Sequence, residues 1–359
     1  MSIIIIFLVV MFCLCYGWGL MVKYTLKNVS CTRAFSQPTF FAGDEGELIE
    51  VVRNNKPFIL PWMRVESRIS PYIRLGRQDN LHVSGEMYYC SLFTVMPHQQ
   101  IRRRHRVKFL HRGYYDLGSV SITAGDMLGL SKAYKIQELS VPVLVYPQLM
   151  STEDLPVPMS RTLGEIVRRQ QLLQDPFLVR GIRAYQPGDP VRDIHWPATA
   201  RTGEVHIRVH DYTAKTRLLV VLNMQSEELQ WRDHLAEQDI AVAEYGISLA
   251  ATLCVESLRA GLAAGFATNM PMAGSKESTV MLPADGTSRE EDILANLARL
   301  NIVRTQHFPT LLESLTAYSG LDILVLSRYD SDSVREGIRL LEAAGNQVSL
   351  HLLEGGGKG

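Results

Sequence analysis

Residues 217–224 read RLLVVLNM, and this run decides the fold of the C-terminal part of the chain. Its apolar side chains follow one another without alternation, which is typical of a strand buried on both faces of a parallel sheet. Downstream, short apolar runs alternate with stretches of helical periodicity. The expected strands are 263–270, 278–285, 321–328 and 347–353, and the expected helices are 234–261, 288–300, 307–320 and 331–345. This alternation predicts a doubly wound α/β domain over residues 217–359.

Several residues in this domain carry the signals that begin or end helices. Ser288, with Glu291 three positions later, has the spacing of a capping box at a helix start. Gly320 and Gly345 are expected to end their helices. Gly261 lies between a helix and a strand, where a C-cap explains a glycine without any functional role.

Residues 24–147 predict a β domain. Short β-branched or aromatic runs are separated by Gly and Pro, as in a β-sandwich or a small barrel. The basic run 102–106, Arg-Arg-Arg-His-Arg, fits either a contact with anionic lipid headgroups or the exposed face of a strand. Residues 148–216 then predict a connector with a helix at 161–173 and a strand at 204–212.

The N-terminus is uncharged and apolar from Ser2 to Val22. About 20 apolar residues suffice to span a bilayer as a helix, so residues 1–23 are predicted to form a transmembrane helix. A cleaved signal peptide would need a basic n-region and a small-residue cleavage site, and the stretch has neither. Because Lys23, Lys27 and Arg33 follow it and nothing basic precedes it, the positive-inside rule places the body of the protein in the cytoplasm.

The composition of the chain argues against several classes of function. Lys and Arg together number 37, as do Asp and Glu, so no global field directs the protein toward nucleic acid. The cysteines form no CxxC pair, which argues against a zinc site or a disulfide scaffold and fits a reducing compartment. They are Cys13, Cys15, Cys31, Cys90 and Cys254.

Residues 185–201, YQPGDPVRDIHWPATAR, hold the densest group of chemically versatile side chains. Pro, Gly and Asp at positions 187–189 predict a turn. Arg183, Arg192 and Arg201 offer planar donors that suit carboxylates, phosphates or stacking on Trp196. The nearest anionic partners are Asp189 and Asp193.

Two interpretations of this segment stay open. In one, the Arg, Asp and Trp side chains satisfy each other in a structural clasp that docks a loop. In the other, they form a binding site for a ligand or a partner. Acid–base catalysis by His195 and Asp193 lacks a third, orienting group in the sequence.

No established metal or nucleophile motif accompanies the segment. His206 and His210 lie on the polar face of an expected strand, too far apart to chelate one ion easily, and no HExxH or Cys/His spacing supports them. The sequence also lacks a G-x-S-x-G elbow, a Walker A loop and a G-x-G-x-x-G loop.

The segment resembles the pattern R-x-Y-x-P-G-D-x-x-R-x-I-x-W-x-x-x-A-R of the bacterial "domain of unknown function 58" family. A second resemblance lies upstream, where RGYYDLG is followed by GDMLGL at 125–130. The residues that match the first pattern are Arg183, Tyr185, Pro187, Gly188, Asp189, Arg192, Ile194, Trp196, Ala200 and Arg201, with Asp211 where an acidic residue is usual.

This resemblance implies a membrane-anchored protein with a β domain and a C-terminal domain similar to von Willebrand factor type A. Such proteins are commonly encoded beside MoxR-type AAA+ ATPases, which implies an adaptor or chaperone-like role without an established reaction. Many relatives have two membrane helices, whereas this chain shows one apolar segment. Type A domains bind Mg²⁺ through D-x-S-x-S, but the matching place here reads Asn223-Met224-Gln225-Ser226-Glu227, a degenerate site that predicts loss of metal binding.

Three functional hypotheses follow from the sequence. The first is a non-enzymatic, membrane-tethered interaction protein that needs no cofactor and has a MoxR-type ATPase as its partner. The second is an anion-binding or enzymatic site built on the motif at 183–201. The third is a surface adhesion module, which requires the opposite membrane topology.

Overall fold

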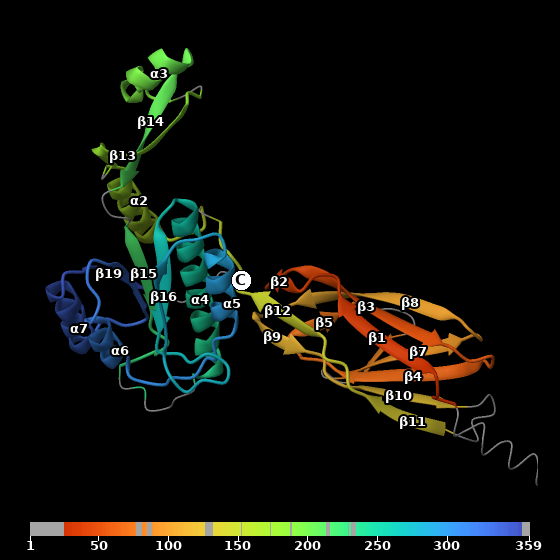
Figure 1. Ribbon diagram of the computed structural model, residues 1–359. Helices are drawn as coiled ribbons and strands as arrows, with labels where there is room; N and C mark the ends of the chain where they lie inside the picture. Colours follow the sequence, from red (N-terminus) through yellow and green to blue (C-terminus); the bar gives the residue numbers. More distant parts are fainter. Residues whose placement is uncertain are drawn as a thin grey trace, which may run out of the picture. The chain divides into compact units, whose positions relative to one another are not determined.

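A computed structural model describes residues 25–76, 81–84, 88–125, 132–151, 153–172, 174–186, 189–212, 216–228, 230 and 235–353. The chain divides into two compact units, Met1–Gln148 and Leu149–Gly359 (Figure 1). The predicted transmembrane helix at residues 1–23 lies outside the described residues. The architecture is mixed α/β: the described part of the N-terminal unit consists of strands and loops, and the described helices lie in the second unit.

The N-terminal unit is built from antiparallel strands, apart from one parallel pair between β2 and β12. Its sheets have the orders β1-β3-β8-β5, β11-β10-β4-β7-β6 and β2-β12-β9. The strands are β1 Val29–Phe35, β2 Thr39–Phe41, β3 Glu45–Asn54, β4 Leu60–Arg68, β5 Ile73–Leu75, β6 Leu81–Ser84, β7 Tyr88–Val95, β8 Gln100–Phe109, β9 Gly113–Asp116, β10 Val120–Gly125, β11 Lys132–Gln137 and β12 Pro142–Tyr146.

The two larger sheets of this unit share a buried core. Cys31 and Val52 of the first sheet pack with Met63, Phe93 and Ile122 of the second. Alternate side chains along each strand therefore point inward, which is the arrangement of a β-sandwich.

The basic run on β8 follows the same alternation, which corrects the expectation of one exposed face. Arg102, Arg104 and Arg106 are exposed, but His105 is buried and the Arg103 guanidinium lies 3.9 Å from the centre of the Phe93 ring. In a strand, successive side chains point to opposite faces, so a continuous basic run is divided between the surface and the interior.

An ionic cluster lies within the sandwich beneath this run. The Glu50 carboxylate accepts two hydrogen bonds from Arg33, at 2.9 and 2.6 Å, and contacts His105 Nε2 at 3.4 Å. Tyr89 lies over the Arg33 guanidinium, 4.8 Å from its ring centre. Burial opposes ionisation of Glu50, but His105 and Arg33 outweigh it and hold the pKa of the carboxyl below its ordinary value.

The second unit contains a five-stranded sheet in the order β17-β16-β15-β18-β19. Strands β16, β15, β18 and β19 are parallel, and β17 is antiparallel at one edge. The elements are α2 Val157–Leu172, β13 Gln174–Ala184, η1 Val191–Asp193, α3 Trp196–Thr202, β14 His206–Tyr212, β15 Arg217–Leu222, α4 Glu237–Arg259, β16 Ala263–Thr268, β17 Thr279–Ala284, α5 Arg289–Ala298, α6 Phe308–Leu315, β18 Asp322–Ser327, α7 Asp332–Ala343 and β19 Gln347–Leu352.

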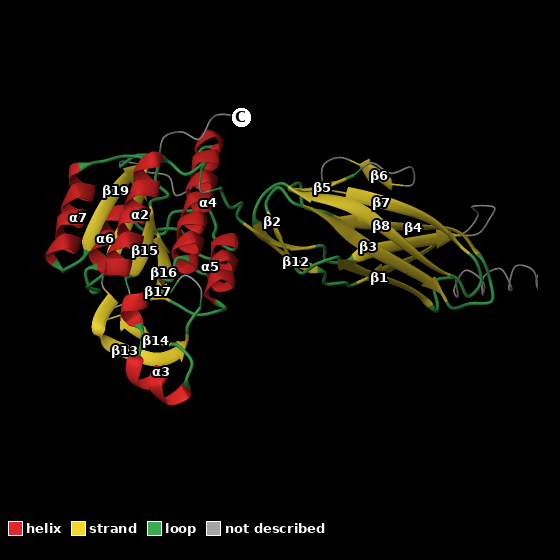
Figure 2. Cartoon of the chain, turned by 90° about the horizontal axis from the view of Figure 1, so that it is seen from above, coloured by secondary structure: helices red, strands yellow, loops and turns green. Residues whose placement is uncertain are grey.

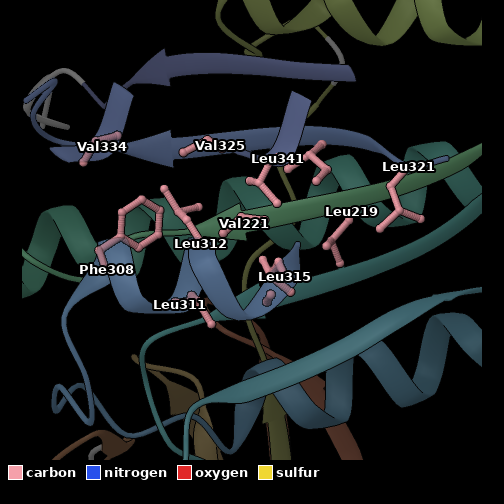
Figure 3. Close-up of a cluster of buried hydrophobic side chains, with 12 residues drawn as sticks. Leu219, Val221, Phe308, Leu311, Leu312, Leu315, Leu321, Val325, Val334 and Leu341 are labelled. Atoms are coloured by element: carbon pink, nitrogen blue, oxygen red, sulfur yellow. The ribbon is translucent and has the colours of Figure 1, made fainter. Parts of the chain in front are cut away.

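Helices cover both faces of this sheet, with α4 and α5 on one side and α6 and α7 on the other (Figure 2). Leu219 and Val221 of β15 face α6, where Phe308 and Leu312 complete a fully buried cluster (Figure 3). Leu222 points the other way, since a Cβ on Gly246 of α4 would lie 2.9 Å from it. Strand β15 is thus buried on both faces, as its unbroken apolar run requires.

The start of α5 and the end of α6 differ from the sequence-based predictions. Ser288 precedes α5 but its side chain makes no capping hydrogen bond, because its backbone is already helical (φ −89°, ψ −6°), so the capping-box prediction was wrong. Helix α6 ends at Leu315, before Gly320, which has φ +70° in the following loop.

Among the described residues, one helix is long and apolar enough to cross a membrane, at Asp239–Arg259 within α4. Its most apolar window is 67% buried, and the helix packs on β15 and β16. The apolar composition of this segment is therefore explained by its place in the core of the α/β unit.

Candidate functional site

The sequence motif lies on a two-stranded hairpin, β13 and β14, which is separate from the five-stranded sheet. The strands pair in an irregular antiparallel register, with shifts between Gln174 and Gly181, and become regular where Arg183 faces Ile207. The motif forms the connection between the two strands and contains η1 and α3. Pro187 and Gly188 lie outside the described residues.

One bidentate ion pair organises the start of the connection. Arg183 donates from Nη1 and Nη2 to the two oxygens of Asp189, at 2.8 and 2.7 Å, and the same carboxylate accepts the Gln186 N–H at 2.7 Å. The hydrogen bonds from Arg183 hold the pKa of Asp189 below its ordinary value, and the pair raises the pKa of Arg183. Asp189 thus accepts hydrogen bonds both from the Arg183 side chain and from a backbone N–H.

His195 is the N-cap of α3. Its Nδ1 accepts the Ala198 N–H at 3.0 Å, and its backbone N–H donates to His206 of β14 at 2.8 Å. Pro in the first turn favours the helix start, and Gly203 ends the helix in the left-handed region at φ +77°. His195 thus positions α3 against the hairpin, and the lone pair on Nδ1 is already occupied.

The exposed side chains of the motif are both apolar and cationic. Of residues 181–186 and 189–209, whose side chains are described, only Ile207 is buried. Trp196 is 65% exposed and Val191 69%, while Ile182, Tyr185 and Val205 are also exposed. We use the name motif surface for these five apolar side chains together with the three arginines of the motif: Ile182, Arg183, Tyr185, Val191, Arg192, Trp196, Arg201 and Val205.

The three arginines of the motif differ in their partners. Arg183 is held by Asp189, and the Arg192 side chain is 82% exposed with its Nε 3.9 Å from Asp193. Arg201 is exposed on α3. The guanidiniums are therefore neither buried nor all held in close ion pairs.

The second candidate site lies at the C-terminal end of β15, where the strand order reverses between its two neighbours. Asn223 and Gln225 are buried there, and Glu227 is exposed. Asn223 donates to Ser327 Oγ at 3.0 Å and accepts the Gln225 N–H at 3.0 Å. Gln225 Oε1 accepts the N–H of Phe308, the first residue of α6, at 2.7 Å.

Asn269 of the neighbouring loop completes this amide network by accepting the Met224 N–H at 2.9 Å. The residues at the degenerate site do not fit a divalent cation, because their buried oxygens already accept hydrogen bonds and are uncharged. In the described part of the chain, no three His, Cys, Asp or Glu side chains are grouped to hold a metal ion.

The ionic cluster of Arg33, Glu50 and His105 was not foreseen as a structural feature. Glu50 lies two residues from Leu48 and from Val52, and His105 lies two and four residues before Val107 and Phe109, so each shares the inward face of its strand with apolar residues. This spacing is the signal that could have placed Glu50 and His105 inside the sandwich.

Comparison with known proteins confirms the family resemblance. Residues 181–303 match the family described as "Protein of unknown function DUF58". An uncharacterized protein of Bacillus subtilis (strain 168), YeaD, is 20% identical over 280 residues, which is 78% of this chain and 64% of that protein. The chain therefore spans less than two thirds of the length of this relative.

Two of the similar solved structures each match about a third of the chain. The match to a non-cellulosomal cohesin from Archaeoglobus fulgidus covers 32% of this chain and 91% of the cohesin chain, with 9% identity and a TM-score of 0.25. The CARDB domain of a Pyrococcus furiosus protein covers 33% and 90%, with 15% identity and a TM-score of 0.22. Neither likeness is close enough to assign a fold.

Proposed function

We propose that this chain, a member of the DUF58 family through residues 181–303, is a membrane-anchored interaction protein without catalytic activity. Residues 1–23 anchor it, and its body lies in the cytoplasm. It binds a partner protein through the motif surface, and the partner is a MoxR-type AAA+ ATPase, as the family resemblance implies. Together they act in the assembly or maturation of other proteins.

The observation that carries this proposal is the exposure of the motif surface. Exposed apolar side chains accompanied by polar ones are candidates for a binding site. Trp, Tyr and Arg are also the residues that contribute most at protein–protein interfaces. Trp196, Tyr185 and Arg192 supply all three types on one hairpin.

The C-terminal unit is proposed to be similar to von Willebrand factor type A. Numbered along the chain from β15 to β19, the strand order of its sheet is 3-2-1-4-5, with the third strand antiparallel at the edge. Open α/β sheets bind ligands beyond the C-terminal ends of their strands, and this edge is proposed as a second docking surface. Docking there would not depend on a metal, because neutral amides occupy the site.

The enzymatic alternative has less support from the geometry. A general base needs a free lone pair and an orienting partner, but His195 Nδ1 already caps α3. Arg183, the arginine best placed to bind an anion beside the turn, is held by Asp189.

A pull-down from native membranes tests the proposal. The full chain should enrich an AAA+ ATPase, and Trp196→Ala should lower the recovery about tenfold or more, as expected for loss of an interface hot spot. Tyr318→Ala, at an exposed tyrosine elsewhere on the α/β unit, is the matched control and should leave recovery unchanged. Equal recovery with both variants, or no enriched AAA+ ATPase, would contradict the proposal.

A further inference from the structure

Three segments meet at the end of the β unit where β1 begins, and we name them the N-terminal tip: residues 25–28, 54–59 and 96–99 (Figure 1). The Asn55 N–H donates to Asn28 O at 3.0 Å, and the His98 N–H donates to Lys56 O at 3.1 Å. Asn54 Nδ2 donates to Met96 O at 3.1 Å. The turns β3–β4 and β7–β8 are therefore fixed beside the start of β1.

The tip exposes apolar side chains that the sandwich does not need. Phe58 is 64% exposed, Met96 50% and Ile59 37%. They lie at the ends of turns, where polar residues are the rule in a soluble domain. This combination resembles the apolar face of proteins that dip into the interfacial layer of a membrane.

The described segments around these apolar residues carry exposed cations. Lys27 lies in the tip, and Arg53 and Arg102 are exposed on the adjoining ends of β3 and β8. The three segments of the tip contain no Asp or Glu. Cations clustered within a few residues of a transmembrane segment attract anionic phospholipids.

Chain length places the tip close to the bilayer. Two residues, Lys23 and Tyr24, separate Val22, the end of the apolar segment, from Thr25 in the tip, so the chain advances three residue steps between them. Even a fully extended chain spans at most about 3.3–3.6 Å per residue, so the gap is roughly 10 Å. The headgroup layers add about 10–15 Å in total to the hydrocarbon core, so the tip lies at the membrane surface if residues 1–23 span it.

We propose that the N-terminal tip docks on the anionic phospholipid surface into which the anchor inserts. Phe58, Ile59 and Met96 enter the interfacial layer, and Lys27, Arg53 and Arg102 contact lipid phosphates. This inference rests on the proposed membrane anchor. Its consequence is that the β unit is held at the membrane surface by more than a flexible tether.

Quenching by brominated lipid tests the proposal on the full chain in vesicles of phosphatidylcholine with or without phosphatidylglycerol. Phe58→Trp places a reporter in the tip. Tyr72→Trp is the matched control, because Tyr72 is 49% exposed at the opposite end of β8, where its carbonyl accepts the Leu110 N–H. All native tryptophans stay the same in the two variants.

The added quenching in Phe58→Trp should be about twice that in Tyr72→Trp or more, since an interfacial side chain lies roughly 5–10 Å into the headgroup–acyl boundary. The difference should grow with phosphatidylglycerol, and Lys27→Gln combined with Arg53→Gln should remove that growth. Equal quenching in the two reporters overturns the docking of the tip. A difference that phosphatidylglycerol does not alter overturns the role of the cations.

Trp18, within the apolar segment, separates this inference from the proposed anchor. If Trp18→Phe removes the quenching seen in the unmodified chain, the anchor is inserted and the two reporters judge the tip alone. If Trp18→Phe changes nothing, the anchor itself is absent and both proposals fail.

Discussion

Glu50 is a carboxylate in the centre of the sandwich, and its partners decide whether the charge can remain there. Its side chain is fully buried with the Arg33 guanidinium 2.6 Å away. Breaking a buried pair by removing one partner leaves an uncompensated charge, which costs about 3–5 kcal/mol. We therefore expect Glu50→Ala to lower the free energy of unfolding of the β unit by that amount.

Thermal unfolding of the detergent-solubilised chain, with hydrogen exchange of the β3 and β8 amides, measures this change. Glu47→Ala is the matched control, since Glu47 lies on the outer face of the same strand and meets Arg104 at 3.5 Å with both side chains largely exposed. Such surface pairs contribute about 0–1 kcal/mol. Similar losses in the two variants would contradict a stabilising role for the buried cluster.

The same carboxylate gives the β unit a dependence on pH. Because the pKa of Glu50 is lower in the folded protein, its stabilisation is present above its ordinary pKa of 4.5 and is lost as the pH falls through the folded value. We expect the melting temperature of the β unit to fall below about pH 4.5, and to fall less steeply in Glu50→Gln. Parallel pH profiles for the two proteins would show that other groups are responsible.

At the scale of the element, the edge strand β17 approaches β16 so closely at Gly265 that a side chain would not fit there. The β16–β17 register shifts between Ala264 and Phe266, so Gly265 lies opposite an irregular part of β17 that has one extra residue. A Cβ there would lie 2.2 Å from the Met281 carbonyl oxygen. Gly265→Ala should therefore destabilise the α/β unit by about 1–3 kcal/mol through overpacking.

Gly164→Ala is the opposite case and the control for Gly265→Ala. Gly164 lies in α2 with nothing within 4 Å of an added Cβ. Alanine in a helix interior is favoured over glycine by about 0.5–1 kcal/mol. Thermal unfolding should shift down for Gly265→Ala and up for Gly164→Ala, and an unchanged stability in the former would refute the close approach of β17.

The amide network after β15 predicts a second element-scale effect. Gln225→Ala leaves the first N–H of α6, that of Phe308, without its acceptor, which costs about 1–3 kcal/mol for a buried group. Glu227→Ala, two residues on and exposed, should change little. Calorimetry with millimolar Mg²⁺ or Mn²⁺ should show no binding by the unmodified chain, and measurable binding would refute the loss of the metal site.

Element boundaries show which parts of the structure a local pattern can predict. The unbroken apolar run of β15 identified a doubly buried strand because burial on both faces leaves no alternation. The Ser288 side chain makes no capping hydrogen bond because its own backbone is helical, and α6 ends at Leu315, before the glycine that was expected to end it. The alternation that buries His105 was hidden by the basic run around it.

At the scale of the whole molecule, the exposure of the motif could not be predicted from its residues. The same Arg, Asp and Trp side chains fit a buried clasp or an open surface, and only tertiary packing distinguishes them. Asp189, one of the two nearest anionic partners in the sequence, pairs with Arg183, whereas the Trp196 and Arg192 side chains are largely exposed. The sequence therefore indicated which groups could pair locally, but it did not indicate whether the motif would be buried or exposed.

Membrane topology is a further prediction at this scale. With the body in the cytoplasm, protease added to intact spheroplasts should leave residues 25–359 uncut, and permeabilisation should allow cleavage, first in exposed connections such as the motif segment. A periplasmic protein of known location serves as the positive control. Cleavage of the chain in intact spheroplasts would instead support the surface adhesion hypothesis.

Binding of a partner at the motif surface is tested most directly by a photo-crosslinking residue in place of Trp196, activated in living cells. We expect an adduct with an AAA+ ATPase of the MoxR type that is absent when the same residue replaces Tyr318. The same adducts from both positions, or none at 196 while the protein is folded and membrane-bound, would contradict the central claim.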